Sequence, residues 1–142
     1  MQKILKRALF LVSFLSLFIL FVAATFNENC FRGGDDWKAP ISAKTLENPL
    51  IKFKGNAKII NLGKSLYTQQ CATCHGDSGL GDGLAARYLQ KSPTDLTTKK
   101  FQSQTDGEIF WKIVNGNSPM PTFSEMLTEK KIWIVVNYLR TL

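Results

Sequence analysis

One five-residue stretch, Cys71-Ala72-Thr73-Cys74-His75, constrains this chain more than any other feature. It holds two of the three cysteines and the only histidine among 142 residues. Cys-x-x-Cys-His spacing is typical of covalent c-type haem attachment, in which two thiols bond to the macrocycle and the histidine binds iron. The motif therefore predicts Cys71 and Cys74 as covalent anchors of one haem and His75 as the proximal iron ligand.

Other chemistries fit the motif less well. A structural zinc site needs four ligands, and the third cysteine, Cys30, lies far away in a polar segment. A thioredoxin-like redox pair should follow a strand and precede a helix, and no such pattern surrounds Cys71 and Cys74. A simple disulfide between these two cysteines would leave His75 without a role.

A methionine between two prolines is the best candidate for the second axial ligand. Met120 lies in Asn-Gly-Asn-Ser-Pro-Met-Pro-Thr-Phe, and prolines fix φ and stiffen such a loop. Met126 is the alternative, although its place beside a helix start favours packing. With His75 and Met120 as ligands, the iron would have no open site for substrate, and methionine would raise its reduction potential. This predicts an electron-transfer protein and not an enzyme.

The first 26 residues form an export or membrane segment. Three basic residues precede an uncharged apolar run over 8–26. The run is longer than the roughly 7–15 apolar residues of a cleavable signal and matches the roughly 17–25 of a spanning helix. We expect a retained membrane anchor, with cleavage after Ala24 as the alternative. Either outcome exports the remaining chain, which agrees with haem attachment outside the cytoplasm.

The remaining chain divides into a linker and one folded domain. Residues 27–58 carry glycines and prolines without sustained periodicity, which predicts a tether. The folded domain is predicted over 59–142. Asn61 would cap a helix over 62–70, Thr105 and Glu108 form a capping-box pattern before a second helix ending at Gly116, and a third helix follows Thr128. A short helix over 84–90 is also expected.

The expected fold class is all-α. No strand pattern occurs, and the stretches 76–104 and 115–127 are long irregular connections for so small a domain. Three or four helices of this size bury a limited core. A large apolar cofactor enclosed by the helices would complete it.

Residues 59–142 resemble the class I monohaem cytochromes c. The matching segments are CATCHGDSGLGDG at 71–83, SPTDLT at 92–97, NGNSPMPTF at 115–123 and IWIVVNYLRTL at 132–142. The resemblance implies a first and a last helix that cross at Gly63, Tyr67 and Tyr138. It also implies that the Pro93 carbonyl accepts a hydrogen bond from the ring of His75. The leader and tether are similar to those of membrane-tethered bacterial cytochromes of the respiratory chain.

Further expectations concern the surroundings of the haem and the partners. Trp111 and Phe110 would pack on the haem, and Trp111 or Arg87 would bond a propionate, with ordinary core packing or surface exposure as the alternative. The glycines of 76–83 would let the backbone pass close to the haem edge. Cys30 is a poor match to a lipidation site. No nucleic-acid partner and no small-molecule substrate are expected, and lysines such as Lys64, Lys91, Lys99 and Lys112 would face an acidic protein.

The sequence thus predicts a shuttle for electrons between respiratory proteins on the periplasmic side of the cytoplasmic membrane. Its partners would be donor and acceptor cytochromes, an oxidase or a quinol-oxidising complex. Two alternatives remain: a fixed haem subunit of a membrane oxidoreductase or oxidase, and an enzyme such as a peroxidase, which would need an open iron site.

Overall fold

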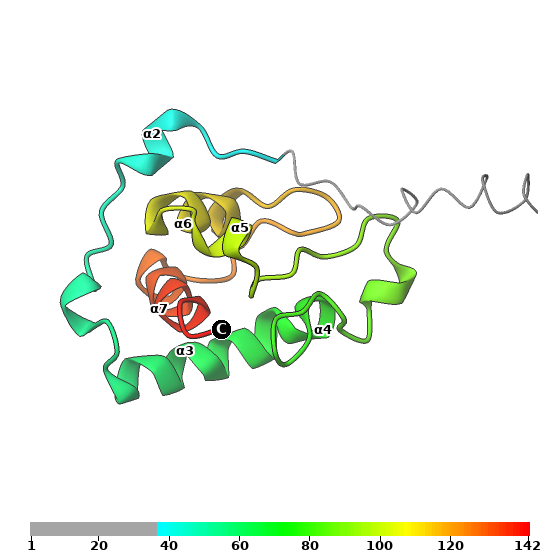
Figure 1. Ribbon diagram of the computed structural model, residues 1–142, viewed down its shortest axis with the longest axis horizontal. Helices are drawn as coiled ribbons and strands as arrows, with labels where there is room; N and C mark the ends of the chain where they lie inside the picture. Colours follow the sequence, from blue (N-terminus) through cyan, green and yellow to red (C-terminus); the bar gives the residue numbers. More distant parts are fainter. Residues whose placement is uncertain (1–36) are drawn as a thin grey trace, which may run out of the picture. The chain divides into compact units, whose positions relative to one another are not determined.

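The computed structural model describes residues 37–142 (Figure 1). Within this range the chain forms six α-helices and two short 3₁₀ helices. The described part contains no strand, only an isolated bridge between Asn117 and Met120. The all-α prediction is therefore confirmed. The predicted anchor or signal over 1–26 and the thiol of Cys30 lie outside the described residues.

Within residues 37–142, none of the helices has both the length and the apolar character needed to cross a membrane.

Two long helices cross to make the centre of the fold. They are α3 (Ala57–Gln70) and α7 (Glu129–Leu139), which lie against each other in Figure 1. Gly63 lies at the crossing, where a built Cβ would come within 2.6 Å of both the Ile134 carbonyl oxygen and the Tyr138 Cβ. The rings of Tyr67 and Tyr138 pack at 5.2 Å beside it. The predicted close crossing of the first and last helices is confirmed.

Helix α3 starts earlier than predicted. Its N-cap is Asn56, whose side chain accepts hydrogen bonds from the backbone of Lys58 and Ile59, and not Asn61. Asn61 is exposed within the helix. Both asparagines could serve as caps, so the apolar residues Ile59 and Ile60, which pack on the core, decide the start.

The second main helix begins and ends as predicted, and the third begins as predicted. In α6 (Asp106–Asn115) both halves of the Thr105–Glu108 capping box are present, and Gly116 ends the helix with φ of +63°. The Thr128 side chain caps α7 by accepting from the Lys131 backbone. Capping chemistry is local, which is why the sequence alone located these ends.

The long connection over 76–104 contains only short elements, the 3₁₀ turn η3 (Ala86–Tyr88) and α5 (Lys99–Gln102). One further short helix, α4 (Ala72–His75), precedes it directly. The helix expected over 84–90 is thus a single 3₁₀ turn, and Leu84 and Tyr88 are exposed. Without buried apolar residues one turn apart, the segment has no packing to extend it.

The structure corrects the predicted domain start. Part of the predicted linker, residues 37–58, carries α2 (Ile41–Lys44) and the 3₁₀ turn η2 (Ile51–Phe53). Ala43 is 1% exposed and Asn48 is 5% exposed, so this segment packs on the domain. At Gly107, a built Cβ would lie 2.1 Å from the Ala43 carbonyl oxygen, which shows how closely α2 and α6 approach. Single buried residues between polar ones produce no periodicity, and for this reason the sequence pattern missed them.

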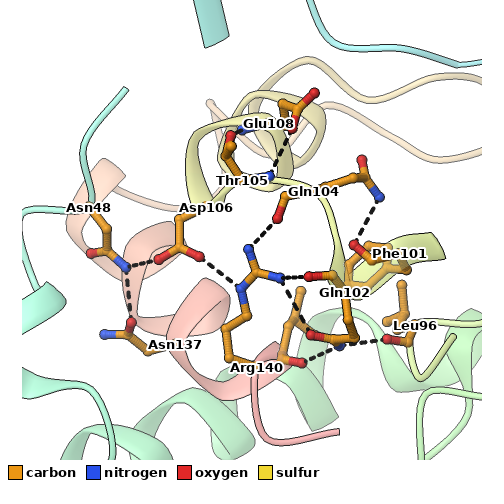
Figure 2. Close-up of polar contacts among 11 residues, drawn as sticks. Asn48, Leu96, Phe101, Gln102, Gln104, Thr105, Asp106, Glu108, Asn137 and Arg140 are labelled. Atoms are coloured by element: carbon orange, nitrogen blue, oxygen red, sulfur yellow. Dashed lines mark hydrogen bonds and ion pairs between the residues drawn. The ribbon is translucent and has the colours of Figure 1, made fainter. Parts of the chain in front are cut away.

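A polar network joins this segment to the ends of α6 and α7 (Figure 2). Asn48 Nδ2 donates to Asp106 Oδ2 at 2.8 Å and to Asn137 Oδ1 at 2.9 Å. Arg140 Nε pairs with Asp106 Oδ1 at 2.8 Å. The same guanidinium donates to the carbonyl oxygens of Gln102 and Gln104. The network therefore connects three segments that are distant in the sequence: the segment at Asn48, residues 102–106 and residues 137–140.

Candidate functional site

A cavity of about 570 Å³ lies inside this helical frame. Its volume falls in the range of roughly 300–1,000 Å³ typical of sites that bury a small molecule or cofactor. Much of its wall is apolar, with residues from all six α-helices and from the segments that connect them; these include Leu89, Leu96, Phe101, Ile109, Ile113, Phe123, Val135 and Leu139. Five of the six predicted site residues line it: Cys71, Cys74, His75, Pro93 and Met120.

The Cys-x-x-Cys-His motif forms one helical turn, α4. The backbone amides of Cys74 and His75 both donate to the Cys71 carbonyl, at 3.1 and 2.9 Å. Gly76 then ends the turn with φ of +77°, a conformation that favours glycine. This turn therefore brings the two thiols and the imidazole to the same cavity wall.

The Cys71 thiol lacks the lowered pKa that is typical of a redox-active cysteine. Both thiols of the motif are free, so no disulfide joins Cys71 to Cys74. Burial, with a smaller contribution from the neighbouring Cys74 thiolate, raises the pKa of Cys71 to about 12. Redox-active cysteines have lowered pKa values that favour the thiolate. The raised pKa therefore argues against thiol–disulfide chemistry at this motif.

The imidazole of His75 is oriented for metal binding. Its Nδ1 lies 3.1 Å from the Thr94 carbonyl oxygen, which can only accept, so Nδ1 carries the proton. Burial lowers the pKa of His75, although the bond to Thr94 opposes this shift. The neutral ring keeps the lone pair of Nε2 available for iron, and the carbonyl partner fixes the tautomer and orientation.

The partner of His75 differs from the prediction by one residue. The carbonyl of Thr94, and not that of Pro93, accepts the bond. The carbonyl of Pro93 instead lies over Gly81, where a built Cβ would come within 2.5 Å of the Pro93 oxygen. Gly81, with φ of +80°, lets the loop after the motif pass beneath the 93–94 segment. This glycine-rich loop therefore supports the segment that orients His75, and its predicted passage close to the haem edge stays a prediction.

Met120 is held at the cavity wall by a compact loop. Asn117 and Met120 exchange two backbone hydrogen bonds of 2.9 Å, and Thr122 Oγ1 donates to the Val114 carbonyl. Met120 packs partly buried against the core, and the flanking prolines also line the cavity. Met126 is 51% exposed and does not line the cavity. The loop therefore fits the predicted ligand position for Met120, which stays a prediction.

Trp111 does not line the cavity. Its ring packs at 6.1 Å against Trp37, which does line it. Sequence reasoning also missed Thr94 and the cavity residues of the predicted linker. A lone tryptophan in an otherwise hydrophilic segment was the available signal for Trp37.

The cavity suits a macrocycle better than a bare metal ion. Within residues 37–142, no three His, Cys, Asp or Glu side chains are clustered closely enough to hold a metal ion. The wall instead combines two thiols, one oriented imidazole, one thioether and a broad apolar surface. These groups match the needs of a covalently attached haem with two protein ligands.

Comparison with known families agrees with this reading of the cavity. The model of the family Cytochrome C oxidase, cbb3-type, subunit III matches residues 59–139, more than half of the chain. The chain belongs to this family. It is a class I cytochrome c-like protein with one covalently bound haem c, an iron cofactor, and the family function is haem-based electron transfer.

Two solved structures are similar to this cytochrome. A chain of the Kuenenia stuttgartiensis reducing HAO-like protein complex Kustc0457/Kustc0458 is 25% identical, with a TM-score of 0.58 over 68% of this chain and 48% of its own length. This cytochrome therefore spans about half of that relative. The KustC0563 c-type cytochrome is 32% identical over 56% of this chain and 94% of its own, with a TM-score of 0.45. Among curated proteins, the comparison found no match.

Proposed function

We propose that this cytochrome is a one-electron carrier with a His75- and Met120-ligated haem c that shuttles electrons between respiratory-chain proteins. One observation carries the proposal. The Cys-x-x-Cys-His turn and the Pro-Met-Pro loop, which lie 45 residues apart between His75 and Met120, share the wall of one apolar cavity.

Each residue has a distinct role in this proposal. Cys71 and Cys74 anchor the macrocycle through thioether bonds. His75 offers Nε2 to the iron, and the Thr94 carbonyl fixes its ring by accepting from Nδ1. Met120 offers its thioether sulfur to the iron from the Pro-Met-Pro loop. The bound haem c supplies a centre that gains and loses one electron.

These ligands favour electron transfer over catalysis. With His75 and Met120 as its two protein ligands, the iron would have no coordination site left for a substrate, and the methionine would raise the potential. The apolar side chains around the cavity, such as Phe101 and Phe123, exclude water and hold the ligands in one geometry. A peroxidase would need the position that Met120 fills.

The proposed location is the periplasmic side of the cytoplasmic membrane. The basic residues and the apolar run of 8–26 support an anchor, or an export signal if the leader is cleaved. The partners would be donor and acceptor cytochromes, an oxidase or a quinol-oxidising complex. Neither nucleic acid nor a small-molecule substrate is part of the proposal.

A fixed subunit of an oxidase complex is the second candidate, because the family's name describes a subunit of a cytochrome c oxidase. Purification of the full chain after mild detergent extraction separates the two. A shuttle elutes alone and exchanges electrons with added partners. A fixed subunit co-purifies in constant ratio with the other subunits.

The roles of the methionines can be tested with a matched pair of substitutions. Met120→Ala should open an axial position, so that the reduced protein binds carbon monoxide and its reduction potential falls. Met126→Ala should leave both properties unchanged, because Met126 is exposed and away from the cavity. Equal spectra for the two variants would exclude Met120 as a ligand and remove the main support for the carrier.

A further inference from the structure

The segment ahead of the family-matched domain supplies part of the cavity wall. We call residues 37–48 the strap. The family match begins at residue 59, so the strap lies outside it. Five strap residues nevertheless line the cavity: Trp37, Lys38, Ala39, Ile41 and Lys44. Figure 1 shows the strap passing along the side of α6 that faces away from α3.

We propose that the strap completes the haem site of this cytochrome and raises its reduction potential, through the cover of Trp37 and the charge of Lys44. This inference rests on the proposed function, because it assumes that haem fills the cavity. It adds to that function a determinant of the potential that lies outside the family-matched domain.

The strap is fastened at both ends. At its start, Trp37 packs against Trp111, and the Lys112 ammonium lies 5.5 Å from the centre of the Trp37 ring. At its end, Asn48 is buried, bonds to Asp106 and Asn137 (Figure 2), and accepts from the Leu50 backbone through Oδ1. A side chain with three such bonds costs free energy to remove, because its partners are partly or fully buried and would lose their hydrogen bonds. Asn48 is thus a positioning residue for the strap.

The middle of the strap fits closely against α6. Ala43 is almost fully buried, and Gly107 provides the space for its carbonyl oxygen. Any side chain at position 107 would push the strap away from α6. Together with the two fastened ends, this contact holds the strap as a fixed wall.

An ion pair between the strap and α6 faces the same cavity. Lys44 Nζ lies 3.9 Å from Glu108 Oε1, and both residues line the cavity. The other oxygen of Glu108 accepts from the Thr105 backbone in the capping box. Lys44 therefore offsets the negative charge of Glu108, which the capping box holds at the cavity wall.

The direction of the effect follows from the charge of the haem. The ferric haem carries one more positive charge than the ferrous haem, so water and negative groups favour the ferric state. Excluding water with Trp37, and offsetting Glu108 with Lys44, both disfavour the ferric state and raise the potential. Substitutions that remove Trp37 or the charge of Lys44 should therefore lower the reduction potential, and a substitution that removes the charge of Glu108 should raise it.

Redox titration of the full-length holoprotein at low ionic strength tests these predicted changes in reduction potential. Trp37→Ala and Lys44→Gln should each lower the potential, with a change of about threefold to tenfold in the ferrous-to-ferric ratio at a fixed potential; tenfold is about 59 mV. Glu108→Gln should raise it, and glutamine keeps the capping box. Lys130→Gln is the matched control, since it removes an exposed charge away from the cavity.

A second variant tests the fastening of the strap. Asn48→Ala should lower the potential and speed protease cleavage within 37–48 of the full chain, while the haem stays covalently attached. Potentials that match wild type in the Trp37, Lys44 and Glu108 variants, with low-spin spectra intact, would overturn the strap proposal alone. A wild-type protein that binds carbon monoxide readily would instead contradict the proposed function.

Discussion

Replacing Arg140 with alanine should destabilise the protein more than any exposed substitution. The guanidinium pairs with Asp106 at 2.8 Å, and the two side chains are only 14% and 20% exposed. It also donates to the carbonyls of Gln102 at 2.8 Å and Gln104 at 2.6 Å (Figure 2). Water reaches these groups poorly, so the alanine variant would leave one carboxylate oxygen and two carbonyls without their donors.

The expected loss is about 3–5 kcal/mol. Hydrogen bonds to a charged group contribute roughly 1.5–3 kcal/mol each, and at the lower end of this range, which the partial exposure of Arg140 favours, three of them sum to about 4.5 kcal/mol. Removing one partner of a buried pair typically costs about 3–5 kcal/mol, which agrees with the sum. At roughly 4 °C or more per kcal/mol, the midpoint of thermal unfolding should fall by about 12 °C or more.

Urea unfolding of the holoprotein, followed by far-ultraviolet circular dichroism, measures this loss. Arg140→Lys keeps the charge but cannot bond the three acceptors as a planar fork, so it should recover less than half of the stability. Lys64→Ala, on the exposed side of α3, should change the stability by less than about 0.5 kcal/mol. A loss below about 1 kcal/mol for Arg140→Ala would refute the reasoning, because water would then replace the guanidinium.

Three further predictions concern the helix crossing, pH and partners. Gly63→Ala should lose about 1–3 kcal/mol in urea unfolding, because its Cβ would collide with Ile134 and Tyr138; the gain of about 1 kcal/mol typical of an exposed helix would contradict the crossing. Stability should fall as the pH rises above 10, because burial raises the pKa of Tyr67 above its ordinary value, so that the unfolded chain releases this proton first. Tyr67→Phe, measured by urea unfolding from pH 8 to 11, should flatten this fall, and an unchanged slope would contradict the assignment. Electron-transfer rates with an acidic protein partner should decrease as the salt concentration rises, because salt screens the charges of the exposed lysines. Stopped-flow rates that are independent of salt would contradict electrostatic steering by these lysines.

The local features of the fold were predictable from sequence. The Thr105–Glu108 capping box, the Thr128 cap and the Gly116 stop depend on residues within one turn, and all three are present. The helix crossing at Gly63 was inferred from the family resemblance, and the structure confirms it. The cavity also gathers Cys71, Cys74, His75 and Met120, as the motif and the Pro-Met-Pro loop predicted.

The long-range contacts were not predictable. The bonds from Asn48 join residues 58 and 89 positions away, and one asparagine in a polar segment gives no periodic signal. The same reason explains the missed role of the strap. The early start of α3 at Ala57 depends instead on the packing of Ile59 and Ile60 against the core. The choice between the carbonyls of Pro93 and Thr94 depends on one residue of loop register, which Gly81 sets through its contact with Pro93.

The absorption spectrum of the purified holoprotein, recorded oxidised, reduced, and reduced under carbon monoxide, decides whether His75 and Met120 both bind the iron. We expect low-spin bands of one covalent haem c that do not change with carbon monoxide, because both protein ligands would be in place. Rapid binding of carbon monoxide would contradict ligation by Met120 and favour an enzyme or a gas-binding protein. A purified protein without haem bands would contradict the account entirely.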